Sequence, residues 1–195
     1  CRRSGQVDEA AALGRLLGMH HAFGTFMDFQ GGEYGMAVLS KYPVDRAIVH
    51  RLPDGAEPRC ALEVVVRPPG VPAGVSFVCI HNDWTDEKIR VRQVRALLAA
   101  LGARKRPVIL AGDFNAPRSA ASMRLLAAAG WTVLEKGGEK NTFPADRPRV
   151  EIDFIVVRGF GERAPACRVH GETAASDHRP ITAVLTLEKQ PSDNK

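Results

Sequence analysis

The sequence predicts an α/β fold in which two mostly antiparallel β-sheets pack together and helices lie on the outside. Seven β-rich runs and three helical patterns occur in the 195 residues, and they do not alternate regularly as a parallel βαβ sheet requires. Two neighbouring runs, residues 61–66 and 75–81, are joined by a short loop rich in Pro and Gly, which favours an antiparallel pair. A chain of this length is expected to form a single domain over residues 1–195.

Three segments have helical character. The first covers residues 8–17 and is rich in Ala and Leu. The second is expected to start after Thr85 as N-cap, with acidic residues in its first turn, and to end at Gly102. The third is expected between the N-cap Ser119 and Gly130. The apolar side chains of the second helix follow an i, i+3, i+4, i+7 pattern, namely Val94, Leu97, Leu98 and Leu101.

The expected strands are runs rich in β-branched and other apolar residues. They cover residues 36–39, 47–51, 61–66, 75–81, 108–111, 152–157 and 181–187. The polar residues 190–195 are expected to form a disordered tail.

The composition is that of a globular protein with a basic surface. The 45% of hydrophobic and 25% of charged residues exclude a disordered or collagen-like chain. No apolar run reaches the ~18 residues that could span a membrane. The net charge of +5 fits an anionic partner, and equally a basic surface with no specific partner. The four cysteines form no C-x-x-C pair, which argues against a disulfide scaffold and favours a reducing, cytoplasmic compartment.

Several polar residues stand where buried strands end. Alternate residues of a strand share one face, and His81 is the last member of such a series, after the apolar residues 75, 77 and 79. An imidazole is thereby expected at the rim of a buried face. Taken alone, this histidine could equally be a core residue with satisfied hydrogen bonds.

A carboxylate and an amide follow the apolar run 108–111. Asp113 and Asn115 would point the same way if the backbone stayed extended beyond Gly112. The alternative is an Asx-turn that only closes the strand.

Asp153 is the polar residue of an otherwise apolar run, and a buried carboxylate requires a partner. A histidine, a metal ion or an arginine could serve. Further along, Ser176, Asp177 and His178 are contiguous and therefore make a poor hydrolase triad, because such triads are assembled from distant segments. If these side chains meet His81 and Asp113 in space, their oxygens suit Mg²⁺ or Mn²⁺, and the imidazoles suit acid–base chemistry.

Six segments in this order carry a family resemblance that spans roughly residues 31 to 187. They are residues 35–40, His81-Asn82-Asp83 with Arg90 and Gln93, Gly112-Asp113-Phe114-Asn115, Thr142-Phe143-Pro144, Ile152-Asp153-Phe154-Ile155 and Ser176-Asp177-His178-Arg179-Pro180. Together they resemble the endonuclease/exonuclease/phosphatase superfamily of metal-dependent phosphoesterases. The resemblance implies a four-layered α/β sandwich, with two mostly antiparallel sheets flanked by helices.

The resemblance also implies catalytic roles in the hydrolysis of a phosphomonoester or phosphodiester by in-line attack of water. His178 would face the scissile phosphate, and Asp153 would fix its tautomer and charge. Asp113 would orient or deprotonate the attacking water. Asn115 would hold that water or a phosphate oxygen.

The same resemblance implies two further roles. His81 would donate to a phosphate oxygen as negative charge develops there. Asp177 would be a metal ligand, and Mg²⁺, or Mn²⁺ in its place, would neutralise the phosphate and the leaving oxygen.

The resemblance is incomplete at the N-terminus. The family starts with a strand that carries an Asn, followed by a Gln-Glu pair whose Glu is the principal metal ligand, and neither motif occurs here. Residues 2–17 resemble the family's segment on the C-terminal side of that pair, so the first strand is expected to be missing, and Cys1 is interpreted as a truncation rather than a lipid-modified terminus. A non-catalytic binding module on the same fold is therefore the alternative function. Glu33 is interpreted as a surface charge rather than a replacement ligand.

The substrate stays open among nucleic acids, phospholipid head groups and small phosphate esters. A basic face on the second helix suits a phosphate backbone, although a solvated helix surface explains it equally well. This face comprises Lys88, Arg90, Arg92 and Arg95. The protein is expected to be a monomer.

Overall fold

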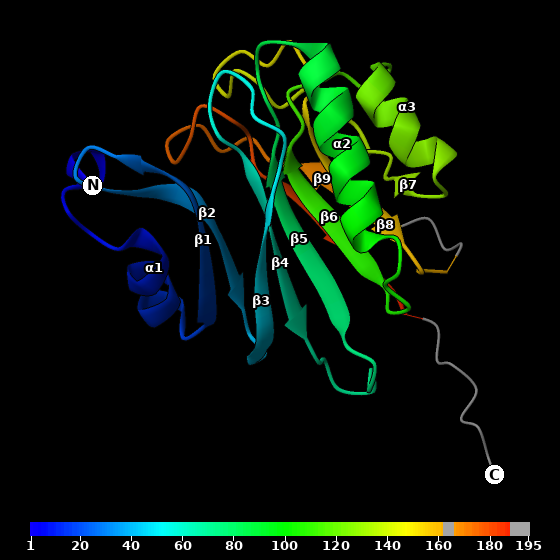
Figure 1. Ribbon diagram of the computed structural model, residues 1–195, viewed down its shortest axis with the longest axis horizontal. Helices are drawn as coiled ribbons and strands as arrows, with labels where there is room; N and C mark the ends of the chain where they lie inside the picture. Colours follow the sequence, from blue (N-terminus) through cyan, green and yellow to red (C-terminus); the bar gives the residue numbers. More distant parts are fainter. Residues whose placement is uncertain (162–165, 188–195) are drawn as a thin grey trace.

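The computed structural model describes residues 1–161 and 166–187, and it confirms the four-layered α/β sandwich. Figure 1 shows helix α1 lying on the β1–β2 pair, this pair packed against the large sheet, and helices α2 and α3 on the opposite face of that sheet. The tail of residues 190–195, expected to be disordered, lies outside the described residues.

The described elements are a short 3₁₀ helix, three α-helices and ten strands. The helices are η1 (Arg2–Ser4), α1 (Glu9–Leu17), α2 (Glu87–Leu101) and α3 (Ala121–Ala128). The strands are β1 (His20–Phe29), β2 (Gly32–Ser40), β3 (Val44–Arg51), β4 (Cys60–Val66), β5 (Val75–His81), β6 (Val108–Asp113), β7 (Thr132–Val133), β8 (Asp153–Arg158), β9 (Ala166–Val169) and β10 (Ile181–Val184). No helix among the described residues is long and apolar enough to cross a membrane.

The largest sheet contains six strands in the order β3-β4-β5-β6-β8-β7. Its neighbouring strands are antiparallel except for β5 and β6, which run parallel because helix α2 connects them. Two antiparallel pairs, β1–β2 and β10–β9, complete the described strands, where two continuous sheets were expected. Strands β1, β7 and β9 were not predicted, because they are short or lack a sustained apolar alternation.

Two helix starts differ from the prediction. The N-cap of α2 is Asp86, whose carboxylate accepts from the Lys88 amide at 2.8 Å, and Thr85 lies one residue outside. Helix α3 starts at residue 121, because the preceding residues form a turn in which the Ala120 amide donates to the Pro117 carbonyl at 2.8 Å. The start of α1 agrees with prediction, since Asp8 caps it through the Ala11 amide at 3.0 Å.

The main core lies between the large sheet and helices α2 and α3. It is built from fully buried side chains that include Val78, Ile80, Val94, Leu97, Leu101, Leu110, Phe114, Leu126 and Phe154. A second cluster fills the space between the sheet and the β1–β2 pair. Strand β4 contacts both and is buried along its whole length. The sheet is therefore held rigidly from both sides, and its strand ends provide fixed positions for polar side chains.

Candidate active site

Three of the residues singled out in the sequence lie side by side across the ends of neighbouring strands. His81 of β5 pairs with Asp113 of β6, and Asp113 pairs with Asp153 of β8. Residues paired directly across a sheet project from the same face. His81 Nε2 lies 3.4 Å from Asp113 Oδ2 as a result. This row, His81–Asp113–Asp153, is the base of the candidate site.

Gly112 allows β6 to lie close to β5 at this point. Its φ of +146° belongs to a region that side chains rarely adopt, and a Cβ atom there would collide with the carbonyl oxygen of Ile80. The glycine therefore fixes where Asp113 enters the row.

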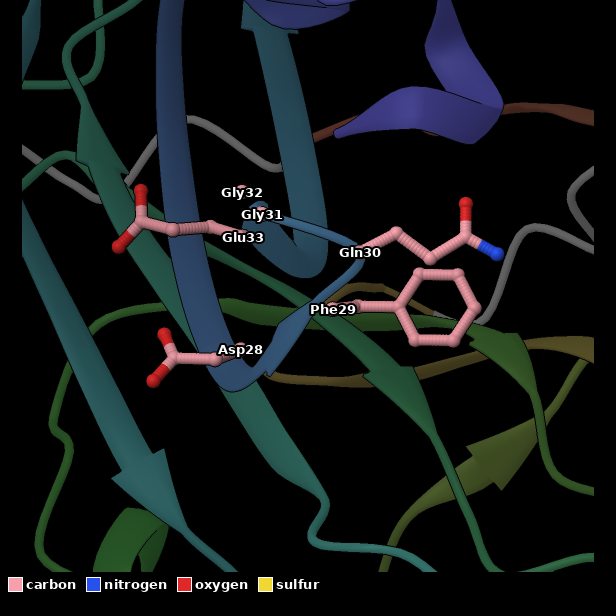
Figure 2. A pocket seen from close by; sticks show the side chains of 6 residues that line it. All are labelled: Asp28, Phe29, Gln30, Gly31, Gly32 and Glu33. Carbon is pink, nitrogen blue, oxygen red and sulfur yellow. The ribbon is translucent and has the colours of Figure 1, made fainter.

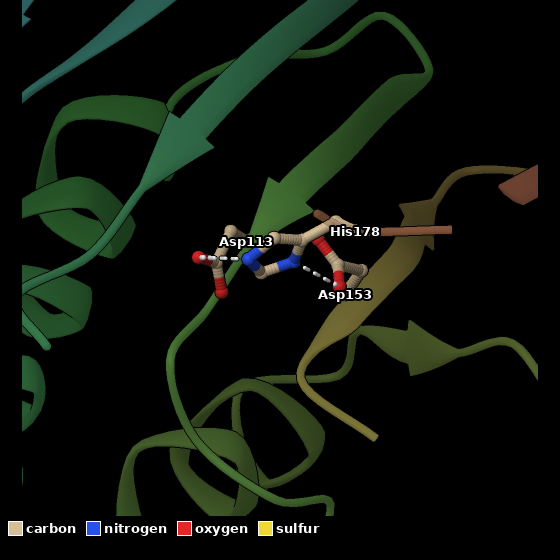
Figure 3. A group of neighbouring side chains, drawn as sticks. All are labelled: Asp113, Asp153 and His178. Carbon is tan, nitrogen blue, oxygen red and sulfur yellow. Dashed lines mark hydrogen bonds and ion pairs between the residues drawn. The ribbon is translucent and has the colours of Figure 1, made fainter. Parts of the chain in front are cut away.

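His178 reaches the row from the loop before β10. Together with Asp113 and Asp153 it forms a group of three neighbouring side chains. Its Nδ1 lies 2.9 Å from Asp153 Oδ2 and its Nε2 lies 4.0 Å from Asp113 Oδ2. Figure 3 shows the imidazole between the two carboxylates. The partner required by Asp153 is thus a histidine, one of the alternatives that the sequence left open.

The segment around Thr142, Phe143 and Pro144 supports the His178 loop. The Phe143 ring packs on the imidazole with a centroid separation of 4.8 Å. The Arg179 amide donates to the Thr142 carbonyl at 2.8 Å, and the Ala145 amide donates to the Asp177 carbonyl at 2.7 Å. This motif of the resemblance therefore positions the site without belonging to the row.

Asn115 lies beyond a turn and not on an extended strand. Its amide donates to Asp113 Oδ1 at 2.7 Å, which is the Asx-turn that the sequence left as an alternative, and its φ is +50°. Its Nδ2 donates to the Asn82 carbonyl at 3.0 Å. The condition for Asp113 and Asn115 to point the same way is therefore not met, although both flank the end of β6.

Asp177 lies outside the group of three. Its side chain is exposed, and the Ser176 hydroxyl lies 3.4 Å from its Oδ1. The Ser176 hydroxyl also accepts from the His178 amide at 3.1 Å, so these contiguous residues form a local turn and not a triad.

Arg59 is a neighbour of the row that the sequence analysis did not identify. It is only 3% exposed, and its Nη1 lies 3.0 Å from His81 Nδ1. The signal that could have revealed it is its position directly before the wholly apolar start of β4, because a cation that enters a core needs a polar partner.

The two imidazoles differ in protonation because their surroundings differ. Burial, together with the nearby charges of Arg59 and His178, lowers the pKa of His81 to about 4. The hydrogen bond to Asp153 raises the pKa of His178 above its ordinary value. Near neutral pH, His81 is neutral and His178 is biased toward the imidazolium form.

Asp113 lies between these imidazoles with a perturbed carboxyl group. Burial and the neighbouring Asp153 carboxylate raise the pKa of Asp113 to about 6, against the opposing effect of the Asn115 amide. A carboxylate with such a pKa is suited to accept a proton from water near neutral pH.

The group of three also has the composition of a site for a hard cation. Ligand atoms of Asp113, Asp153 and His178 lie within 4.8 Å of one another. Two carboxylates in such proximity fit Mg²⁺ or Mn²⁺, which prefer oxygen ligands. The imidazole is a weaker match, since its Nδ1 is already engaged with Asp153.

Two of the hollows on the described surface lie near residues discussed above. The larger, 470 Å³, surrounds the turn between β1 and β2, where Asp28 and Glu33 project to one side (Figure 2). Glu33 there accepts from the Thr25 hydroxyl at 3.0 Å, and none of the lining residues is buried. The smaller, 300 Å³, is lined by residues that include Asp153, His178 and Pro180. We assign the candidate site to the smaller hollow, because it gives access to the hydrogen-bonded pair of Asp153 and His178, and the pKa of His178 is raised by that bond.

Comparison with known proteins identifies the family of the chain. The sequence profile of the Endonuclease/Exonuclease/phosphatase family matches residues 2–178. The chain belongs to this family. It is 30% identical over 175 residues to the uncharacterized protein YbhP of Escherichia coli strain K12, an alignment that covers 85% of this chain and 68% of YbhP.

Solved structures show the same fold at lower identity. A conserved protein of unknown function from Enterococcus faecalis V583 superposes with a TM-score of 0.80 at 20% identity, over 93% of this chain and 82% of its own. The mannosyl-6-phosphatase Bt3783 of Bacteroides thetaiotaomicron VPI-5482 superposes with a TM-score of 0.69 at 16% identity, over 86% and 77% of the two chains.

Proposed function

We propose that this protein is a phosphoesterase that depends on a divalent metal ion and hydrolyses a phosphomonoester or phosphodiester by in-line attack of water. The observation that carries the proposal is the row of His81, Asp113 and Asp153, with His178 placed between the two carboxylates. Membership of the family and the phosphatase of the same fold support it.

The first part of the proposed mechanism concerns the water and its activation. Asp113, with its pKa raised to about 6, would accept a proton from the attacking water. Asn115 would hold this water through its amide oxygen, since its Nδ2 donates to Asn82. Fixing the water beside its base replaces a bimolecular encounter and lowers the barrier.

The second part concerns the phosphate. His178, held by Asp153 and biased toward the imidazolium form, would donate to an oxygen of the scissile group. His81 would donate to a second oxygen through Nε2. Each donor stabilises charge that develops in the transition state, typically by a factor of about 10²–10³ in kcat.

A Mg²⁺ or Mn²⁺ ion would neutralise the phosphate and the leaving oxygen when bound. Carboxylate oxygens would hold it, those of Asp177 as the sequence resemblance implies, which leaves Asp113 as the base. The substrate class is proposed as a nucleic acid, a phospholipid head group or a small phosphate ester, and the protein as a monomer.

Hydrolysis of bis-nitrophenyl phosphate, with added Mg²⁺ and with EDTA, tests the proposal. We expect activity that requires the metal and falls at least ~100-fold in His178→Ala. His170→Ala is the matched control, because His170 pairs with Thr182 at 2.7 Å on the exposed β9–β10 surface, and its replacement should leave the activity unchanged. Activity that persists in EDTA, or in His178→Ala, contradicts the mechanism.

Two further measurements separate the remaining possibilities. Calorimetric titration with Mg²⁺ distinguishes a phosphoesterase from a non-catalytic binding module, since a well-folded chain that binds no Mg²⁺ favours the module. A panel of DNA, inositol phosphate and sphingomyelin-type substrates then identifies the substrate class.

A further inference from the structure

Arg59 connects the loop before β4 to the candidate site. Its Nη2 lies 3.0 Å from Glu57 Oε2, and its guanidinium carbon lies 5.4 Å from the centre of the Phe26 ring. Its Nη1 lies 3.0 Å from His81 Nδ1. With 3% of its surface exposed, the guanidinium is held in one orientation by an anion, an aromatic face and an imidazole.

This contact fixes which nitrogen of His81 carries the proton. A guanidinium has five N–H donors, no acceptor, and stays charged in proteins. His81 Nδ1 must therefore be the acceptor, with a free lone pair, and the proton of the neutral ring must be on Nε2. Because Arg59 can only donate, its hydrogen bond is sufficient to assign the tautomer of His81.

The second imidazole of the site is held in the opposite way. Asp153 Oδ2, 2.9 Å from His178 Nδ1, can only accept when ionised, so His178 carries a proton on Nδ1. One histidine is thus oriented by a cation and the other by an anion. Both present Nε2 toward Asp113 Oδ2, at 3.4 Å for His81 and 4.0 Å for His178.

We propose that Arg59 is a positioning residue that holds His81 in the Nε2–H tautomer, so that this ring offers a hydrogen-bond donor to an oxygen of the phosphoester. The catalytic consequence rests on the proposed function, whereas the tautomer of His81 is independent of it. Without Arg59, the only restraint on the tautomer is the long 3.4 Å contact of Nε2 with Asp113 Oδ2, and a proton on Nδ1 becomes accessible. Nε2 would then present a lone pair to Asp113 Oδ2 and to the phosphate oxygen, which are both acceptors.

Nitrogen-15 NMR of the full chain labelled in its histidines tests the tautomer directly. Long-range proton–nitrogen correlations distinguish a protonated from an unprotonated ring nitrogen, and His81→Gln assigns the signals. We expect wild-type His81 to show Nε2 protonated and Nδ1 unprotonated near neutral pH. Arg59→Met, which removes the donors, should give a mixture or the other tautomer, and Arg59→Lys, which keeps a cationic donor, should retain the native form.

Kinetics on bis-nitrophenyl phosphate provide the second readout. Arg59→Met should lower kcat by about 100-fold, the cost of one misplaced donor, with little change in KM, and Arg59→Lys should recover much of the loss. Arg51→Met is the matched control, because Arg51 donates to the Phe26 carbonyl at 2.6 Å but does not touch His81. It should leave both the tautomer and kcat unchanged.

The outcomes separate this inference from the proposed function. A wild-type His81 protonated on Nδ1 overturns the inference, as does an Arg59→Met variant with native tautomer and kcat. A chain with the expected tautomers but no activity contradicts only the proposed function. If circular dichroism shows that Arg59→Met does not fold, Arg59→Leu takes its place. It also lacks hydrogen-bond donors, so the same mixture is expected and an unchanged tautomer counts against the inference.

Discussion

His178 Nδ1 donates to Asp153 Oδ2 across 2.9 Å, although 25 residues separate the two in the chain. The contact joins the end of strand β8 to the loop before β10 and leaves Nε2 of the imidazole facing Asp113. It is also the main cause of the raised pKa of His178.

Replacement of Asp153 by Asn should therefore change both the ionisation of His178 and the activity. The pKa of His178, followed by NMR titration, should fall toward its ordinary value, because the amide carries no charge. The amide can also hold the wrong tautomer, so kcat should fall by about 10²–10⁴-fold. Asp146→Asn, at an exposed position, is the control and should change neither quantity. An unchanged His178 pKa would contradict the conclusion that Asp153 raises it.

The pH profile of activity should be bell-shaped, because the proposed mechanism needs Asp113 deprotonated and His178 protonated. Burial raises the pKa of Asp113 to about 6, so the base is lost as the pH falls through that value. The pKa of His178 is also raised, so its proton is lost, and the activity with it, at a higher pH than for an ordinary histidine. The two limbs report apparent values of the coupled group. Initial rates across the pH range, for wild type and Asp113→Asn, test this; a flat wild-type profile would contradict it.

Glu63 should make stability depend on pH through a cluster remote from the row. The carboxylate is fully buried in β4 and bonds to His50, Ser76 and Arg104 at 2.7–3.0 Å. Burial alone would raise the pKa of Glu63, but these hydrogen bonds outweigh it and hold the pKa far below the ordinary value. The contribution to stability is therefore complete above the unfolded-state pKa of about 4.3 and is lost as the pH falls below it.

Glu63→Gln tests this dependence. The substitution removes the charge that pairs with Arg104 and should lower the free energy of unfolding by about 1.5–3 kcal/mol near neutral pH, as measured by urea denaturation. The difference between wild type and variant should shrink as the solution is acidified. A constant difference down to low pH would show that the charge of Glu63 is not responsible.

Gly112→Ala should damage the site through the backbone. At φ +146° an alanine is strained, and its Cβ meets the Ile80 carbonyl, so strands β5 and β6 must separate where His81 and Asp113 face each other. We expect a loss of at least about 1–3 kcal/mol in unfolding free energy and a fall in kcat. Gly171→Ala is the matched control, because nothing lies within 4 Å of its added Cβ and its φ is ordinary. Equal changes in unfolding free energy and in kcat for the two variants would contradict the constraint at Gly112.

The sequence alone determined the class of fold and most of the residues at the candidate site. The apolar alternation that ends at His81, and the apolar runs that end at Asp113 and surround Asp153, mark strand ends, because a polar side chain in a buried strand is costly unless it has a partner or reaches the rim. The tertiary structure decided the rest. Sheet register aligns these three residues, the Phe143 and Thr142 segment carries His178 to them, and the loop before β4 buries Arg59 against His81. Such contacts join segments tens of residues apart, and local pattern contains no information about which distant partner satisfies a buried charge.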